Sequence, residues 1–322
     1  MPVLEVEHLN VRYETNGRSV LACDDVCLAI EERDSVGIVG ESGSGKTTLA
    51  MSILGLLPAK VARVEGTIRF LGRELVGRTS QELSDIRWEK MAAVFQKSMS
   101  ALSPVHKIGY QFQNAYRVHR PKATRTACRA LADTLFAKVN LPSRVYDLYP
   151  HQLSGGMLQR VSIALSLMFS PMLVILDEAA TALDVVTEGQ ILREIVRLQE
   201  AERMAQVTIT HNMAVVSSCC QRVLVMYAGR ILEFGRTVEI LLRPRHPYTM
   251  GLMRSFPSFT KTKGNLRGIP GSLPDLSAPI SGCVFADRCG RSQERCKMER
   301  PPLRQIQPGW DVACFYPEDG IV

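Results

Sequence analysis

The chain has 322 residues, of which 46% are hydrophobic and 22% charged, and its formal net charge is +7. This composition is that of a globular protein of about two domains, and it excludes a largely disordered chain. The longest uncharged apolar stretch, residues 161–176, has 16 residues and contains Pro171. It is therefore shorter than the ~20 residues of a membrane-spanning helix.

The N-terminus and the charge distribution bear on location and partners. Residues 1–7 are acidic and lack the basic and apolar regions of a signal peptide, so we expect the chain to stay in the cytoplasm. A positive net charge permits nucleic acid or anionic lipid as a partner. However, the 39 Lys and Arg residues are dispersed, and aromatic residues make up only 6% of the chain. We therefore expect no direct binding of nucleic acid.

The apolar pattern predicts alternating strands and helices, which indicates an α/β fold. In the first part of the chain we expect strands at 3–7 and 20–30 around a turn at 16–17, a strand at 35–39, a helix at 47–57 ended by Pro58, and a strand at 66–70. A mostly helical region is expected at about 84–170. It is followed by a strand at 173–176, a helix at 187–204, and strands at 207–210 and 223–226. In the helix at 187–204, Ile191, Ile195 and Leu198 share one face. Cys23 and Cys27 are expected to face the same side of their strand as small packed residues.

The composition changes after Gly235, beyond which prolines become frequent and long apolar runs disappear. We therefore predict a first domain at 1–242 and a loop-rich extension at 243–322 that lacks a large core of its own.

Residues 40–47 fit the phosphate-binding pattern G-x-x-x-x-G-K-[ST], with a predicted strand before the loop and a predicted helix after it. In such a loop the glycines let backbone N–H groups surround the phosphates. Lys46 would reach the terminal phosphates, and Thr47 would bind Mg²⁺. A chance glycine-rich turn would lack this context. The predicted nucleotide-binding residues are Gly40, Glu41, Ser42, Gly43, Ser44, Gly45, Lys46, Thr47 and Thr48.

A second motif follows the predicted strand at 173–176. That strand carries Asp177 and Glu178 at its C-terminal end, where α/β sheets bind ligands. Asp177 is predicted to bind Mg²⁺, and Glu178 to act as the general base on water. An Asp-Glu pair alone would be weak support, but together with the phosphate-binding loop it is strong.

A serine and two glycines open a further helix between these motifs. The residues are Leu153, Ser154, Gly155, Gly156 and Met157, ahead of an apolar run from Val161. Such a helix start can bind an anion, and the alternative is a simple N-cap. A single phosphate-binding loop needs no second anion-binding site in its own chain. The presence of both the loop and this helix start therefore suggests a site shared between two subunits.

This motif resembles the signature of ATP-binding cassette (ABC) ATPases, which sandwich ATP between two nucleotide-binding domains. The resemblance implies a RecA-like P-loop core with an N-terminal antiparallel β subdomain and a helical subdomain at about 84–170. It implies that Gln96 contacts Mg²⁺ or the attacking water, that residues 182–184 with Asp184 form the D-loop, and that His211 contacts the γ-phosphate. A lone histidine after a strand is more often structural, but in this register we favour the switch role. Tyr13 resembles the aromatic residue that stacks on adenine.

Within this superfamily, the chain resembles the ATP-binding subunits of oligopeptide and dipeptide importers. The resemblance rests on residues 40–46, 53–58, 149–157, 246–249 and 282–314. It implies ATP and Mg²⁺ as cofactors and a location on the cytoplasmic face of the membrane. The implied partners are a second related ATPase subunit, two permeases and an extracytoplasmic solute-binding protein. The alternatives are a soluble ABC ATPase of nucleic-acid repair or translation, and a scaffold that binds ATP without turnover.

Three positions depart from the family pattern. Ala179-Ala180 replace Pro-Thr, Asn212 replaces Asp, and Asp34-Ser35 replace Gly-Glu. None of these changes removes a predicted catalytic group.

Four of the nine cysteines, Cys283, Cys289, Cys296 and Cys314, crowd into the extension with the spacing C-x5-C-x6-C-x17-C. In a reducing compartment such a group is more often a metal site than a pair of disulfides. The spacing lacks the C-x2-C pairs of most structural zinc sites. Four thiolates can also hold a [4Fe–4S] cluster, as some proteins with a similar tail do. The iron–sulfur cluster, zinc and four reduced thiols remain open at this point.

Overall fold

The computed structural model describes residues 2–15, 17–95, 102–179, 184–255 and 268–318. The chain forms two compact units. The first unit comprises Met1–Ser80 and Thr208–Val322, and the second comprises Gln81–Val207. Each unit is described by itself below.

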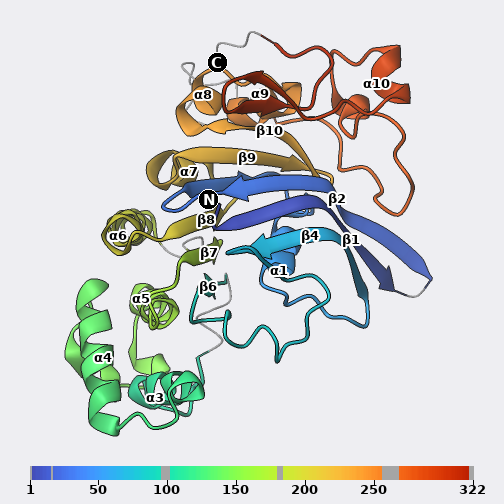
Figure 1. Ribbon diagram of the computed structural model, residues 1–322. Helices are drawn as coiled ribbons and strands as arrows, with labels where there is room; N and C mark the ends of the chain where they lie inside the picture. Colours follow the sequence, from blue (N-terminus) through green and yellow to red (C-terminus); the bar gives the residue numbers. More distant parts are fainter. Residues whose placement is uncertain (1, 16, 96–101, 180–183, 256–267, 319–322) are drawn as a thin grey trace. The chain divides into compact units, whose positions relative to one another are not determined.

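An antiparallel sheet forms the first part of the first unit. It consists of β1 (Leu4–Thr15), β2 (Arg18–Ile30), β4 (Ala62–Phe70) and β5 (Arg73–Glu74) in the order β2-β1-β4-β5 (Figure 1). This confirms the expected antiparallel β subdomain.

The expectation that Cys23 and Cys27 face the same side is wrong. Asp25 has a positive φ of 57°, and the register of β1 against β2 shifts beside it, between Leu9 and Val11. Such a bulge moves the inward positions by one residue. Cys23 is fully buried, whereas Cys27 is half-buried and accepts a hydrogen bond from the backbone N–H of His8 (3.3 Å).

A second sheet of the first unit carries the predicted phosphate-binding loop. Its strands lie in the order β11-β12-β10-β9-β3, with β3 (Ser35–Val39) parallel to β9 (Arg222–Tyr227) and β10 (Arg230–Arg236) antiparallel to β9. All five residues of β3 are buried, as expected for a strand covered on both faces. The helices of this unit outside the extension are α1 (Lys46–Ile53), α7 (Met213–Cys219) and α8 (Thr237–Leu242).

The extension contributes two strands to this sheet. β12 (Trp310–Val312) pairs with β10, and β11 (Arg304–Gln307) pairs with β12. Trp310 is only 2% exposed, and Phe285 is buried as well. The extension is loop-rich, as expected, but it buries more apolar surface than its composition suggests. Its remaining elements are α9 (Pro247–Arg254), η3 (Ala286–Arg288) and α10 (Glu294–Met298).

The second unit is mostly helical. Its elements are β6 (Met91–Val94), α3 (Ile108–His119), α4 (Arg125–Lys138), η1 (Ser143–Asp147), η2 (Pro150–Gln152), α5 (Gly155–Ser166), β7 (Leu173–Asp177) and α6 (Val185–Glu202), and β8 (Ala205–Ile209) returns the chain to the first unit. β6 and β7 are parallel. Phe112 and Phe136 meet edge to face in its core, with ring centroids 5.1 Å apart.

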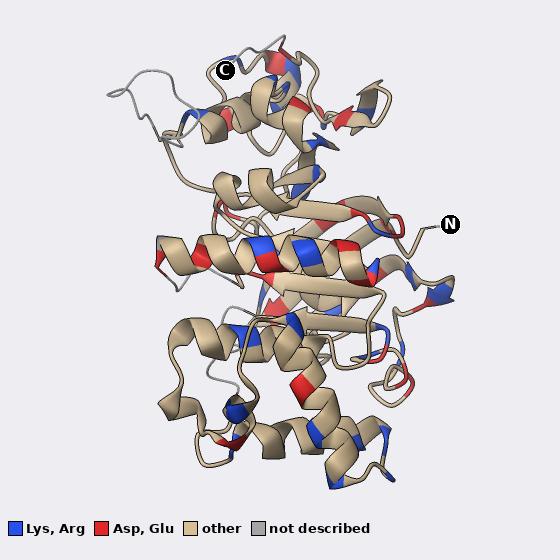
Figure 2. Ribbon diagram, turned by 90° about the vertical axis from the view of Figure 1, so that its left-hand side faces the viewer, with Lys and Arg blue, Asp and Glu red and all other residues tan. Residues whose placement is uncertain are grey.

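Helix α6 shows the predicted amphipathic pattern. Ile191, Ile195 and Leu198 are buried, and Figure 2 shows acidic and basic residues interspersed along the ribbon of this helix. Helix α1 differs from its prediction, since it ends at Ile53 instead of residue 57. Gly55 follows with a positive φ of 62°, which ends the helix before Pro58 is reached. Among the described residues, no helix is long and apolar enough to cross a membrane.

Candidate nucleotide-binding site

The predicted phosphate-binding loop connects β3 to α1. Gly45 has a φ of 101°, and a Cβ atom there would lie 2.4 Å from the carbonyl oxygen of Ala22. Glycine is therefore required at this position by both the backbone conformation and the available space. Helix α1 begins at Lys46 without a side-chain cap, so the N–H groups of its first turn face the loop.

Lys46 lies inside the loop. Its Nζ donates to the carbonyl oxygens of Gly40 (2.8 Å) and Glu41 (2.7 Å) and to Oγ of Ser44 (3.2 Å), and the residue is 8% exposed. The loop thus wraps around its own lysine, which lies where an incoming phosphate would meet the helix N-terminus.

Tyr13 lies near this loop in the same unit. Its hydroxyl is 3.5 Å from Oγ1 of Thr48, and the residue is partly exposed. Cys23 also contacts this loop, where its thiol donates to the carbonyl oxygen of Gly45 (3.8 Å). Burial, helped by Asp24, raises the pKa of Cys23 to about 12, so this thiol is neutral.

The signature residues lie at the start of α5 in the second unit. Ser154 is the N-cap, and its side chain accepts from the backbone N–H of Met157 (3.3 Å). A Cβ atom on Gly156 would lie 2.7 Å from Cγ2 of Thr187, which explains a small residue there. Ser154 is therefore an N-cap of α5, as one of the two interpretations expected. Binding of a second subunit's nucleotide by these residues stays a prediction.

Asp184 caps the neighbouring helix α6 in the same way. Its side chain accepts from the backbone N–H of Thr187 (3.0 Å), and hydrogen bonds from Thr187 lower the pKa of this carboxyl. The rest of the predicted D-loop, at 182–183, lies outside the described residues, as does Gln96.

Asp177 is the last residue of β7, and Glu178 follows it directly. Asp177 is 6% exposed, whereas Glu178 is partly exposed and has a positive φ of 50°. This backbone region is uncommon for glutamate, and residues that adopt it are enriched at functional sites. The strand thus ends on a buried carboxylate followed by one that is turned out of the strand direction.

His211 follows β8 in the first unit and is exposed. Asn212 caps α7, with its side chain accepting from the backbone N–H of Ala214 (2.9 Å). Since Asn and Asp cap helices about equally well, this departure from the family keeps the local structure.

Asp34 is also accommodated. Its carboxylate accepts from Nη1 of Arg222 (2.8 Å) and from the backbone N–H of Glu31 (3.0 Å). Ser35 is buried, and its hydroxyl accepts from the backbone N–H of Gln221 (3.0 Å). The remaining departure is Ala179-Ala180. Of these two residues the structure describes Ala179, which packs against the core of the second unit.

The predicted residues are thus divided between the units. Tyr13, the loop at 40–48 and His211 belong to the first unit. The signature residues, Asp177, Glu178 and Asp184 belong to the second.

Sequence reasoning missed the contacts of the extension with the phosphate-binding loop. Tyr248 of α9 accepts a hydrogen bond from the backbone N–H of Glu41 (3.0 Å), and Arg288 of η3 pairs with the Glu41 carboxylate. These residues lie more than 200 positions from the loop, and nothing in a single sequence connects them.

The four cysteines of the extension line one pocket. Apolar side chains, including Phe285 and Phe315, form much of the remaining wall. The sulfur of Cys314 accepts from the backbone N–H of Tyr316 (3.4 Å). The backbone N–H groups of Phe285 and Arg291 act on the thiols of Cys283 and Cys289 and favour their charged forms. Burial, with a smaller contribution from the other thiols, raises the pKa of Cys283 to about 11. Converging sulfurs with N–H donors suit a metal-bound thiolate set, because the donors stabilise the charged form.

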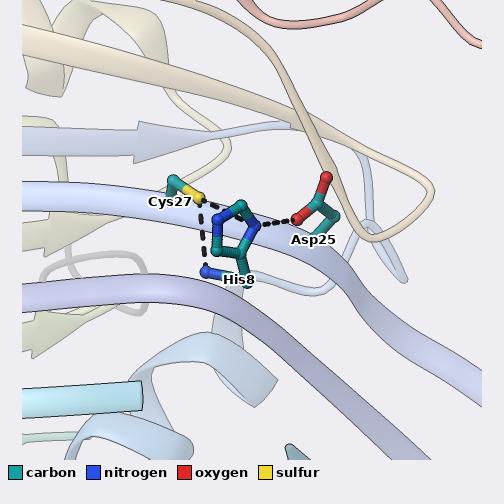
Figure 3. A group of neighbouring side chains, drawn as sticks. All are labelled: His8, Asp25 and Cys27. Atoms are coloured by element: carbon teal, nitrogen blue, oxygen red, sulfur yellow. Dashed lines mark hydrogen bonds and ion pairs between the residues drawn. The ribbon is translucent and has the colours of Figure 1, made fainter. Parts of the chain in front are cut away.

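The spacing of these sulfurs bears on the kind of metal. Among the described residues, His8, Asp25 and Cys27 are the only three potential ligands found within 4.8 Å of one another (Figure 3). No three of the four extension sulfurs are therefore that close. A single tetrahedral zinc ion, with bonds of ~2.3 Å, holds its sulfurs ~3.8 Å apart. The described arrangement thus lacks the close approach of three sulfurs that a single zinc ion requires.

The group in Figure 3 has a local explanation. His8 and Asp25 both have positive φ at the bulge, and Nδ1 of His8 lies 2.7 Å from Oδ1 of Asp25. Asn10 donates to the carbonyl oxygen of His8 (2.9 Å) and accepts from the N–H of Asp25 (3.0 Å). These contacts fasten the irregular part of the β1–β2 pair.

Comparison with known proteins agrees with this fold. A family model described as "ABC transporter" matches residues 23–181. The dimeric structure of the ATP-binding cassette MJ0796 bound to ADP and Pi is 26% identical with a TM-score of 0.65, covering 73% of this chain and 98% of that one. The structure of cbiO1 from Clostridium perfringens is 25% identical with a TM-score of 0.63, covering 74% and 90%. The protein is thus an ABC-type P-loop ATPase.

Comparisons over the whole chain identify the family within the ABC-type ATPases. A family model described as "Oligopeptide/dipeptide transporter, C-terminal region" matches residues 232–296. The probable peptide ABC transporter ATP-binding protein y4tR of Sinorhizobium fredii is 40% identical over 97% of this chain and 94% of its own length. The dipeptide transport ATP-binding protein DppD of Escherichia coli K12 is 37% identical over 99% and 98%. The chain belongs to the family of ATP-binding subunits of peptide and dipeptide ABC importers, and the comparisons give no support to the nucleic-acid alternative.

Proposed function

We propose that this chain binds MgATP at residues 40–48 and hydrolyses it to power uptake of peptides or a related small solute through partner permeases. The observation that carries the proposal is the loop wrapped around Lys46 at the start of α1, in a chain that matches peptide-importer subunits from end to end. Membership in this family supports a place on the cytoplasmic face of the membrane.

The roles of the site residues follow from their chemistry. Lys46 and the N–H groups at the start of α1 bind the phosphates. Thr47, Asp177 and Gln96 hold Mg²⁺ through oxygen atoms, and Glu178 accepts the proton of the attacking water. His211 contacts the γ-phosphate, and Tyr13 stacks on adenine.

The site is completed by a second ATPase subunit. Leu153, Ser154, Gly155, Gly156 and Met157 serve the nucleotide of that partner, and Asp184 lies at the same contact. The relative MJ0796, whose solved structure is dimeric, supports this arrangement. A complete importer would add two permeases and an extracytoplasmic solute-binding protein.

The cysteine pocket is proposed to hold a [4Fe–4S] cluster bound by Cys283, Cys289, Cys296 and Cys314. The converging sulfurs, the N–H donors and the apolar walls support this assignment. When bound, the cluster would supply metal–thiolate bonds that stabilise the fold of the extension. The domain boundary after residue 242 separates this extension from the cassette.

Substitution of Glu178 tests the hydrolytic role. Glu178→Gln keeps the shape of the side chain but cannot accept a proton, so phosphate release by the complex purified from native membranes should fall ~10²–10⁴-fold. Binding of a fluorescent ATP analogue should persist. Glu200→Gln, an exposed change in the same unit, is the control. Near-normal turnover of the Glu178→Gln complex would reject the role, and identification of the bound subunits tests the proposed partners.

Metal analysis tests the cysteine pocket. Protein purified without oxygen should be coloured and contain iron and sulfide in near-equal amounts, and Cys283→Ser should lose both. Cys27→Ser, in the group of Figure 3 outside the extension, should retain them. Zinc without sulfide would reject the iron–sulfur assignment, and four freely alkylated thiols would reject any metal.

A further inference from the structure

Arg288, in η3 of the extension, has a partner for every N–H group of its guanidinium. Nε donates to the carbonyl oxygen of Pro270 (2.8 Å), and Nη2 donates to that of Ile269 (3.1 Å). Nη1 donates to the hydroxyl of Tyr227 (3.2 Å). The two remaining donors bind the carboxylate of Glu41, from Nη1 to Oε2 (2.8 Å) and from Nη2 to Oε1 (3.1 Å).

This ion pair is sheltered from solvent. The Arg288 side chain is 7% exposed and that of Glu41 is 30% exposed. The guanidinium also lies over the ring of Tyr227, 5.5 Å from its centroid. A bidentate ion pair in which every guanidinium N–H is hydrogen-bonded has a fixed geometry, unlike the mobile ion pairs of exposed surfaces.

Glu41 is held at three points as a result. Its carboxylate is bound by Arg288, its backbone N–H donates to the hydroxyl of Tyr248, and its carbonyl oxygen accepts from Lys46. The residue that supports the ammonium of Lys46 is thus anchored to two residues of the extension. The extension also approaches the loop at Gly43, where a Cβ atom would lie 3.3 Å from Leu273.

We propose that Arg288 is a positioning residue for nucleotide binding. It neutralises and orients Glu41, so that the phosphate-binding loop is formed around Lys46 only when the extension is folded against it. The inference rests on the proposed role of residues 40–48 in binding MgATP, and it assigns the extension a regulatory role at that same site.

Electrostatics explains why the pair matters. A nucleoside triphosphate is strongly anionic, and Glu41 is a carboxylate inside the loop that must receive it. With Arg288 in place the pair is neutral overall. Without it, Glu41 would repel the phosphates at short range and would be free to rotate away from Lys46.

The position of Arg288 makes the loop sensitive to the state of the cysteine pocket. Arg288 ends η3 directly before Cys289, and Cys283 lies three residues before Ala286, where this short helix begins. A change that unfolds the pocket would withdraw Arg288 from Glu41 and weaken nucleotide binding. The proposed cluster would therefore affect ATP binding through this arginine, without touching the nucleotide.

Binding of MgATP to the full chain tests the proposal by calorimetry. Arg288→Met should weaken binding about tenfold or more, since it removes two charge-assisted hydrogen bonds from Glu41. Arg288→Lys keeps the charge but cannot bind both oxygens, so its loss should be smaller, and it replaces the methionine variant if that one does not fold. Arg300→Met is the matched control, because Arg300 links the extension to Asp24 of β2 (3.2 Å) without contacting the loop.

The second-site change Glu41→Gln distinguishes a positioning role of Arg288 toward Glu41 from a role in stabilising the extension alone. In the Arg288→Met background it removes the unpaired carboxylate, and binding should recover at least threefold relative to Arg288→Met alone. A loose extension would not be repaired by this change. The proposal is overturned if Arg288→Met binds MgATP as the unchanged protein does, or if Glu41→Gln brings no recovery. Failure of the unchanged protein to bind MgATP would instead reject the proposed function itself.

Discussion

The buried histidine at the start of α9 should make the first unit sensitive to acid. His246 is 1% exposed, and its Nδ1 accepts from the backbone N–H of Tyr248 (3.0 Å). Its own backbone N–H donates to Oε2 of Glu233 (3.0 Å). Burial lowers the pKa of His246 to about 3, because the charged imidazolium would lose its solvation and its role as acceptor.

The magnitude follows from linkage between protonation and folding. The unfolded chain takes up the proton with a pKa of ~6.5, whereas the folded chain resists it down to about 3. The contribution of His246 to stability is therefore complete above pH ~6.5 and is lost as the pH falls toward 3, at up to ~1.4 kcal/mol per pH unit. At pH 5 the loss amounts to ~2 kcal/mol.

Glu233 acts with the opposite sign. Burial raises the pKa of this carboxyl, so it stabilises the folded state at low pH, and that stabilisation disappears as the pH rises through its raised pKa. The histidine contribution must therefore be isolated by substitution. His246→Asn keeps an acceptor suited to an N-cap and removes the titrating group.

Urea unfolding at pH 7.5 and pH 5.0 measures the effect. In a Trp88→Phe background, the fluorescence of Trp310 reports on the first unit, since the chain has two tryptophans and Trp88 lies in the second unit. The difference in unfolding free energy between the protein with His246 and the His246→Asn variant should shift by ~2 kcal/mol in favour of the variant at pH 5.0. An equal difference at both pH values would refute the argument.

Three further predictions address the loop, the shared site and the core. Gly45→Ala should strongly reduce binding of MgATP, because its Cβ would lie 2.4 Å from a backbone oxygen, and calorimetry with Gly290→Ala as control measures this. Ser154→Arg should leave MgATP binding by the isolated chain intact but stop hydrolysis by the assembled complex. A lone chain that hydrolyses ATP at the rate of the complex would contradict this. Phe136→Ala, at a fully buried position, should destabilise the second unit by ~3–5 kcal/mol in urea unfolding followed by Trp88.

Much of the architecture could be predicted from the sequence because local signals agreed with the global fold. Strand β3 and the loop after it were predicted with correct bounds, since a short, mostly apolar run followed by glycines and a lysine has few other solutions. The face of α6 was predicted from its 3.6-residue period. Errors arose where one residue adopts a positive φ, at Gly55 beyond α1 and at Asp25 in β2, because periodicity does not reveal such backbone turns.

The burial of the extension could not be predicted from its composition. Its apolar residues are few, but Trp310 and Phe285 are placed where strands and helices remote in sequence meet them. The indole N–H of Trp310 donates to Glu233 (3.0 Å), and the ring of Phe285 packs edge-on against Tyr227. Core formation here depends on which residues meet, and composition counts only how many there are.

The same reasoning explains why the role of Arg288 is visible only in three dimensions. An arginine before a cysteine suggests at most a charge beside a metal site, and a glutamate within a phosphate-binding loop suggests at most a variable position. Their separation of 247 residues hides the pair. Once the pair is seen, the extension can be understood as a support whose folded state determines the charge and orientation of the Glu41 carboxylate. Because an unpaired carboxylate in the loop would repel an anionic nucleotide, a tail that touches no substrate can still control how tightly the cassette holds ATP.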